Sequence, residues 1–385
     1  MNPPKPSEQL SYFRKRQSQI LDTIQQLIEI ESPSDLKAAV DRLSTALASR
    51  FSELGGKIQL HRQEKFGNHL QINFAGATRN AKPVLMLGHM DTVYSIGTIS
   101  KMKHRIAKGR VFGPGVLDMK AGVALGFHVI EALLMWHKRR LPRPVTILLV
   151  SDEEIGSQSS RAITEKLARQ SEAVLVLEPA SGLNGAVKTS RKGVGGYTLK
   201  VTGKAAHSGL DFEKGQSAVL ELARQITEIS NLGDARKGIT INVGKISGGT
   251  RVNVVPAEAS ASIDVRVATK EDASEMHRRL TSLKPFNSHC KISVTGDINR
   301  PPMQRTDGIA ALYATAQAVA ENLGWKLEEA SVGGGSDGNF TAALGIPTLD
   351  GLGAVGEGAH AEHESVVISE LPRRAALLAG LITSI

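Results

Sequence analysis

Three short apolar runs, each followed at once by acidic residues or histidine, constrain the fold of this chain most. Their apolar residues are continuous rather than alternating, which is typical of strands covered on both faces. Helix-length segments lie between them, so the pattern predicts an α/β fold with a mostly parallel central sheet flanked by helices. The runs are Val84-Leu85-Met86-Leu87 before Gly-His-Met-Asp, Val145 to Val150 before Ser-Asp-Glu-Glu, and Val174 to Leu177 before Glu178-Pro179.

The rhythm of the pattern changes after Lys192. From there to about residue 297 the segments follow the order strand, helix, strand, strand, helix, strand, which matches a split-βαβ sandwich. A chain of 385 residues exceeds the size of one hydrophobic core. We therefore expect a larger domain in two parts, 1–192 and 298–385, with a βαββαβ domain inserted at 193–297.

Apolar positions at helical spacing predict an opening helix from Ser7 to Ile30. We expect a second helix from about Asp35 to Leu54 and a further helix from about Lys120 to Trp136. No apolar run reaches the roughly 18 residues of a membrane span, and the first thirty residues lack the apolar core of a signal peptide. We expect a cytoplasmic protein without a membrane partner. Because Cys290 is the single cysteine, any metal must be held by histidine and carboxylate side chains.

The formal charge of +9 raises the question of a nucleic-acid partner. The basic residues are scattered, however, and the densest group, His137-Lys138-Arg139-Arg140, follows an apolar helix, where cations meet the helix dipole favourably. Aromatic residues make up only 4%, which leaves few platforms for stacking bases. We expect no nucleic-acid partner, and a non-catalytic, basic binding protein is a distant alternative.

The ends of the first two runs carry residues able to bind metal. His89 and Asp91 are two positions apart, so in extended backbone their side chains share a face, and a metal-bound imidazole commonly donates its second N–H to a carboxylate. Glu153 and Glu154 are adjacent and point to opposite sides, so one can bind a metal while the other faces a water molecule. Two such neighbours repel unless a cation is near. The alternatives are a capped loop and a solvated acidic turn.

Further candidates come from the third run and from two loops. Glu178 repeats the pattern of an acid after a buried strand. Asp118 lies in a glycine-rich loop before a helix, where it is either a helix cap or a bridging carboxylate; the spacing there is not that of a phosphate-binding loop. The segment Gly-Ala-His-Ala-Glu-His-Glu offers two histidines, of which we prefer His360 to His363.

Taken together, these segments resemble the di-zinc metallohydrolase family that includes glutamate carboxypeptidases, aminoacylases and succinyl-diaminopimelate desuccinylase. The glutamate carboxypeptidase branch looks most similar. The resemblance spans nearly the whole chain in the expected order. It rests on Gly-His-Met-Asp-Thr-Val at 88–93, Gly-Pro-Gly-Val-Leu-Asp-Met-Lys-Ala-Gly at 113–122, Ser-Asp-Glu-Glu-Ile-Gly-Ser at 151–157, Glu178-Pro179, Gly-Lys-Ala-Ala-His-Ser-Gly at 203–209 and Gly-Gly-Gly-Ser-Asp at 333–337.

The resemblance implies a role for each candidate. His89 and Glu178 would hold one zinc ion, Glu154 and His360 the other, and Asp118 would bridge the two; Co²⁺ or Mn²⁺ is an alternative metal. Glu153 would be the general base and Asp91 the partner of His89. The inserted domain would be a lid and dimerisation domain, whose His207 reaches the active site of the partner subunit in a homodimer. The implied substrate contacts are Asn253, Arg266, Arg300 and Gly335.

The same resemblance predicts hydrolysis of an amide bond beside a free carboxylate, in a small peptide or an N-acyl amino acid. An arginine fork fits a carboxylate through two parallel hydrogen bonds, and Arg300 resembles the arginine that grips this group in the carboxypeptidase branch. An N-acyl amino acid deacylase or a dipeptidase is the alternative, because the spacing from His360 to Glu364 resembles the deacylases equally well.

Overall fold

The computed structural model of this chain describes residues 4–78 and 80–385. It divides into two compact units, each with its own hydrophobic core. The larger unit comprises the residues up to Ser190, Arg305–Val332 and Ser336–Ile385, and the smaller unit comprises Arg191–Gln304 with Gly333–Gly335. The smaller unit is thus slightly longer than the range 193–297 expected for the inserted domain.

The larger unit is built on a six-stranded sheet with the order β1-β2-β6-β3-β7-β14. The strands β6, β3, β7 and β14 are parallel, whereas β1 and β2 are antiparallel to their neighbours. Every residue of β3, β6 and β7 is buried, as the continuous apolar runs predict, so the expected fold class is confirmed. The strands are β1 (Lys57–His61), β2 (His69–Phe74), β3 (Val84–His89), β6 (Val145–Val150), β7 (Ala173–Val176) and β14 (Thr348–Leu349).

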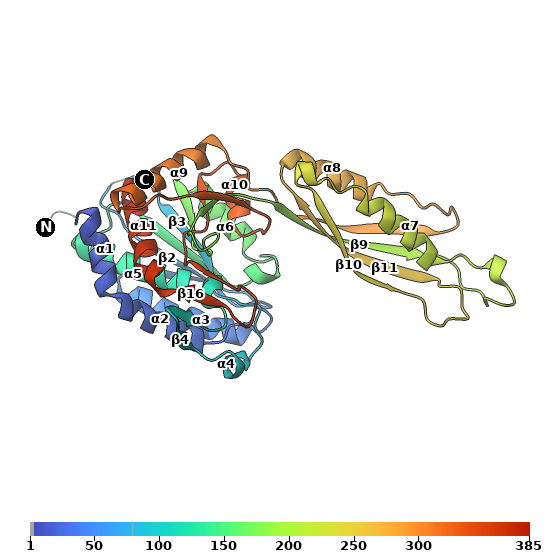
Figure 1. Cartoon of the computed structure of the whole chain (residues 1–385), viewed down its shortest axis with the longest axis horizontal. Helices are drawn as coiled ribbons and strands as arrows, with labels where there is room; N and C mark the ends of the chain where they lie inside the picture. The colour runs from blue at the N-terminus through green and yellow to red at the C-terminus, as the bar shows by residue number, and fades with distance from the viewer. Residues whose placement is uncertain (1–3, 79) are drawn as a thin grey trace. The chain divides into compact units, whose positions relative to one another are not determined.

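Helices cover both faces of this sheet (Figure 1). Because side chains alternate along a strand, Met86 of β3 packs into the core beneath α5, while Leu85 and Leu87 pack into the core beneath α6. The first core is formed with α1 (Pro6–Lys15), α2 (Gln17–Glu29), α3 (Lys37–Glu53), α5 (Ala121–Trp136), α9 (Asp307–Asn322) and α11 (Leu371–Ser384); α6 (Arg161–Arg169) and α10 (Gly338–Ala343) lie on the other face, and α4 (Thr98–Lys101) is a single turn.

The opening helix is divided in two, so the prediction of one continuous helix from Ser7 to Ile30 is wrong. The break falls at Arg16, whose φ and ψ are −102° and 11°. Its guanidinium pairs with Glu131 of α5 at 2.9 Å and lies over the ring of Tyr12. The break lets α1 pack against α11 and α2 against α5, which shows tertiary packing overriding local propensity.

The helical stretch Val116–Trp136 is long and apolar enough to cross a membrane by length and composition, and 78% of it is buried inside the molecule. Its apolar side chains contact the sheet and the helices around it. Burial of this kind is expected for the central helix of a large core.

The smaller unit has the element order β9, α7, β10, β11, α8, β12, which is the expected βαββαβ order. Its antiparallel sheet has the strand order β10-β11-β9-β12. Burial alternates along β9 and β11, because one face packs against the two helices. The elements are β9 (Gly193–Thr202), α7 (Ala218–Ser230), β10 (Thr240–Gly248), β11 (Glu258–Val267), α8 (Lys270–Thr281) and β12 (Lys291–Arg300).

Two small sheets join segments that are far apart in the sequence. One has the order β15-β16-β5-β4 and pairs Ser365 with Phe112. It therefore brings the loop after residue 112 close to the loop before residue 365. The strands are β15 (Gly356–Glu357), β16 (Ser365–Val367), β5 (Arg110–Phe112) and β4 (Arg105–Ala107); the other pair is β8 (Val187–Arg191) with β13 (Glu329–Val332).

Close packing of α5 against the end of β7 generates a prediction about stability. A Cβ on Gly122 would lie 2.1 Å from the carbonyl oxygen of Leu177. Gly122→Ala should therefore lower the free energy of unfolding by about 1–3 kcal/mol, as overpacking does. Gly126→Ala in the same helix is the control, because its Cβ meets only the ends of the Met86 and Leu177 side chains. Urea denaturation of both variants would contradict this account if their midpoints fell equally.

Candidate metal centre

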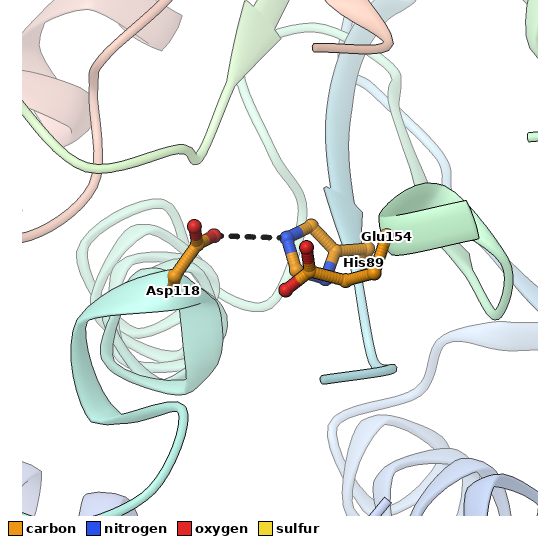
Figure 2. A group of neighbouring side chains, drawn as sticks. All are labelled: His89, Asp118 and Glu154. Carbon is orange, nitrogen blue, oxygen red and sulfur yellow. Dashed lines mark hydrogen bonds and ion pairs between the residues drawn. The ribbon is translucent and has the colours of Figure 1, made fainter. Parts of the chain in front are cut away.

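The histidine and acidic residues at the ends of the buried strands meet at the carboxyl edge of the parallel sheet. His89 is the last residue of β3, Glu154 lies in the turn η2 (Glu153–Ile155) after β6, and Glu178 follows β7. Asp118 approaches from the turn η1 (Val116–Lys120), just before α5. Figure 2 shows the carboxylate of Asp118 facing the ring of His89, with Glu154 beside them. The strand ends predicted to carry ligands do converge there.

Two groups of side chains share the carboxylate of Asp118. In the first, Nε2 of His89 lies 3.1 Å from Oδ1 of Asp118 and 3.5 Å from Oε1 of Glu178. In the second, Nε2 of His360 lies 3.4 Å from Oδ2 of Asp118 and 3.1 Å from Oε2 of Glu154. Each oxygen of Asp118 therefore faces a different imidazole, and each imidazole also faces one further carboxylate. This arrangement suits a carboxylate that bridges two cations.

Potential metal-ligand atoms of the described side chains also lie close together. Potential ligand atoms of His89, Asp118 and Glu154 all lie within 4.8 Å of one another, and so do those of His89, Glu153 and Glu178. Oε1 of Glu154 is buried and has no hydrogen-bond partner among the described residues. A buried carboxylate oxygen without a donor is costly unless a cation satisfies it. Oxygen and imidazole donors in this number fit zinc and related metals.

Asp91 is fully buried and holds the turn that carries the two glutamates. Its Oδ1 accepts the N–H of Glu153 at 3.2 Å, and its Oδ2 accepts the N–H of Glu154 at 3.1 Å and the hydroxyl of Ser34 at 2.7 Å. Nδ1 of His89 lies 2.9 Å from the main-chain oxygen of Asp91 and 3.6 Å from its Oδ1. Asp91 thus contacts His89 mainly through its carbonyl group, whereas its carboxylate orients η2.

The two imidazoles and the carboxylates shift one another's pKa. Burial opposes protonation of His89, but its hydrogen bonds to Asp118 and Glu178 raise its pKa well above the ordinary value. Hydrogen bonds to Asp118 and Glu154 raise the pKa of His360 to about 10. Burial works against ionisation of Asp118, yet the two histidines lower its pKa, while burial raises the pKa of Glu154. The electrostatics favour positive charge between these carboxylates.

The loop before β16 places its two histidines differently. His360 faces Asp118 and Glu154 at the distances given above. His363 is exposed. The assignment of His360 as a metal ligand stays a prediction, which these contacts favour.

The other predicted site residues, among them Gly335, belong to the smaller unit. Nδ1 of His207 accepts the N–H of Gly209 at 3.2 Å, and Asn253 is exposed. Arg266 forms two hydrogen bonds with the carboxylate of Asp264, at 2.9 and 3.0 Å. Arg300 is 6% exposed, and its guanidinium donates to the side chain of Asn299 at 3.1 Å. Their roles with substrate stay predictions.

Three residues that support the centre were not among the predicted site residues. Ser34 binds Asp91, and Tyr94 donates its hydroxyl proton to Glu364 at 2.6 Å. Glu364 in turn accepts the backbone N–H of Asp118 at 2.9 Å. The sequence contains one signal for these residues, which is that Glu364 lies four residues after His360 in a polar loop.

The fold and the convergent carboxylates and histidines suit a metal-dependent hydrolase, and comparison with known proteins shows the family. The model of peptidase family M20/M25/M40 matches residues 85–384. Carboxypeptidase G2 of Pseudomonas sp. (strain RS-16) is 30% identical to this chain, over 95% of this chain and 89% of the relative. The chain belongs to peptidase family M20/M25/M40 and is an enzyme of the peptidase and amidohydrolase class.

Solved structures show the same fold. A tripeptidase from Staphylococcus aureus matches with a TM-score of 0.81 and 23% identity, covering 95% of this chain and 98% of that one. An M20 metallo-carboxypeptidase from Sulfolobus solfataricus matches with a TM-score of 0.73 and 18% identity, covering 95% and 98%. A dinuclear metal-binding M20 peptidase from Bacillus subtilis matches with a TM-score of 0.72 and 16% identity, covering 97% and 100%.

The raised pKa of His360 yields a prediction for chelator-treated protein. Its pKa lies at about 10 rather than 6.5, so the protonated ring stabilises the folded chain fully below pH ~6.5, and this contribution is lost as the pH rises towards 10. NMR titration should find the His360 ring still protonated at pH ~8. In Asp118→Asn the pKa of His360 should fall, since one of its two carboxylate partners is neutral. An ordinary His360 pKa in the unsubstituted protein would contradict the geometry.

Proposed function

We propose that this chain is a two-metal hydrolase that cleaves an amide bond beside a free carboxylate, as a glutamate carboxypeptidase does. The observation that carries the proposal is the position of the Asp118 carboxylate. Each of its two oxygens faces a different histidine, and each of these histidines also faces one glutamate. His89 and Glu178 would hold one Zn²⁺, and Glu154 and His360 the other, with Asp118 between them. Co²⁺ or Mn²⁺ fits the same donors.

Two bound zinc ions would supply a strong Lewis acid that lowers the pKa of a water molecule and polarises the scissile carbonyl group. The chain's own residues supply the proton transfers. The Glu153 carboxylate, held beside His89 and Glu178, would accept a proton from the attacking water and return it to the leaving nitrogen. Asp91 keeps Glu153 in place through the backbone N–H.

The smaller unit would act as a lid and dimerisation domain. We infer that His207 of one protomer donates a hydrogen bond to the developing oxyanion in the active site of its partner, a type of interaction that contributes strongly to catalysis. The guanidinium of Arg300 would bind the free carboxylate of the substrate, with Asn253, Arg266 and Gly335 lining the same site. The similarity to carboxypeptidase G2 over 95% of this chain supports this choice of substrate class.

Replacement of the two adjacent glutamates separates proton transfer from metal binding. Glu153→Gln should lower kcat by about 10²–10⁴-fold while the protein keeps two metal ions, because only the general base is lost. Glu154→Gln should lower the metal content towards one ion per chain, because a ligand is lost. Elemental analysis and steady-state kinetics of both variants test this. Full activity of Glu153→Gln with metals bound would exclude it as the base.

Substrate preference tests the carboxypeptidase assignment. Aroyl-glutamates should be cleaved with higher kcat/KM than acetyl or succinyl amino acids, and amidation of the free carboxylate should lower kcat/KM by at least about tenfold, since a charge-assisted hydrogen bond contributes about 1.5–3 kcal/mol. In Arg300→Met the penalty for amidation should vanish. Higher activity on acetyl or succinyl amino acids would favour a deacylase, and preference for dipeptides would favour a dipeptidase.

A further inference from the structure

The carboxylate of Glu364 is fully buried and accepts hydrogen bonds from four donors. Its Oε1 accepts the backbone N–H groups of Leu117 at 2.7 Å and Asp118 at 2.9 Å. Its Oε2 accepts the N–H of Gly115 at 2.9 Å and the hydroxyl of Tyr94 at 2.6 Å. One side chain therefore fixes the backbone of the segment that presents Asp118.

The same network also reaches the loop that carries His360. Glu364 lies four residues after His360, and the hydroxyl of Tyr94 lies 3.1 Å from the carbonyl oxygen of Ala361. Ser365, the next residue, pairs with Phe112 in the small antiparallel sheet. The Asp118 segment and the His360 loop are thus joined through Glu364 and Tyr94.

Burying a carboxylate at position 364 costs free energy, so stabilising the fold is not the only reason for an acid there. Glu364 is buried, burial raises its pKa, and its backbone partner Asp118 is itself an acid, although the ammonium group of Lys120 also interacts with Glu364. Adding a carboxylate to such a cluster costs repulsion and desolvation. A carboxylate is nevertheless the one side chain that offers acceptors alone on both of its oxygens, which is what four converging donors require.

We propose that Glu364 is a positioning residue that sets the spacing between Asp118 and His360 and thereby the affinity of the metal site these two residues share. The inference rests on the proposed two-metal function, and it assigns to Glu364 a task that none of the metal ligands performs. Replacing a residue that forms a hydrogen bond with a metal ligand commonly lowers the metal affinity by about 10–100-fold.

Glu364→Gln tests this inference with little change in side-chain volume. An amide has one acceptor oxygen and one NH₂ donor, so in either orientation it leaves at least one backbone N–H of the Gly115–Asp118 segment without an acceptor. Titration with Co²⁺, followed by visible absorption and by competition with a chelator, should show one of two ions bound about 10–100-fold more weakly. The absorption bands of that ion should shift. Glu362→Gln, an exposed change of the same charge in the same loop, should leave both ions unchanged.

The outcomes separate this inference from the proposed function. If the unsubstituted protein fails to bind two Co²⁺ ions, the proposed function fails whatever Glu364 does. If it binds two, and Glu364→Gln binds both with unchanged affinity and spectrum, the inference is overturned. A lower urea midpoint of the metal-free variant with unchanged Co²⁺ affinity would show a merely structural role and would overturn it as well.

A second variant covers the case in which Glu364→Gln does not fold. Tyr94→Phe keeps the carboxylate and removes one of its four donors. One Co²⁺ ion should then bind about threefold to tenfold more weakly, in line with the loss of a single hydrogen bond. Unchanged Co²⁺ binding by a folded Tyr94→Phe protein would overturn the inference.

Discussion

The carboxylate of Asp118 is the point on which the rest of this molecule depends. Its two oxygens lie 3.1 Å from His89 and 3.4 Å from His360, so one side chain joins two groups whose histidines lie far apart in the sequence. The carboxylates of Asp118, Glu154 and Glu178 are close together and repel one another unless positive charge lies between them. The carboxylates raise the pKa of both histidines, so that positive charge is favoured between them. A pair of divalent cations would offset the repulsion between the carboxylates more fully.

The fold supplies this convergence through two sheets with different tasks. The buried strands β3, β6 and β7 present His89, Glu154 and Glu178 at one edge, since the ends of parallel strands meet there. The small antiparallel sheet, by pairing β16 with β5, brings the His360 loop to the Asp118 segment. Close approach of α5 to β7, which only glycine at position 122 permits, fixes the start of the helix that follows Asp118.

The sequence predicts the first of these arrangements better than the second. Continuous apolar runs identify β3, β6 and β7, and the order of segments identifies the βαββαβ unit. The strands β5 and β16 have three residues each, too few to show a periodic pattern, so the sequence offers His360 only as the preferred one of two histidines in a polar loop. The network of Glu364 was invisible because most of its donors are backbone N–H groups. The break at Arg16 depends on Glu131, which lies far away in the sequence.

Anomalous diffraction from crystals of the zinc-loaded protein, recorded on both sides of the zinc absorption edge, tests the central claim most directly. The account predicts two peaks about 3.5–4 Å apart, one between His89 and Glu178 and one between His360 and Glu154, with Asp118 touching both. A single peak, or two peaks of which neither contacts Asp118, would contradict it.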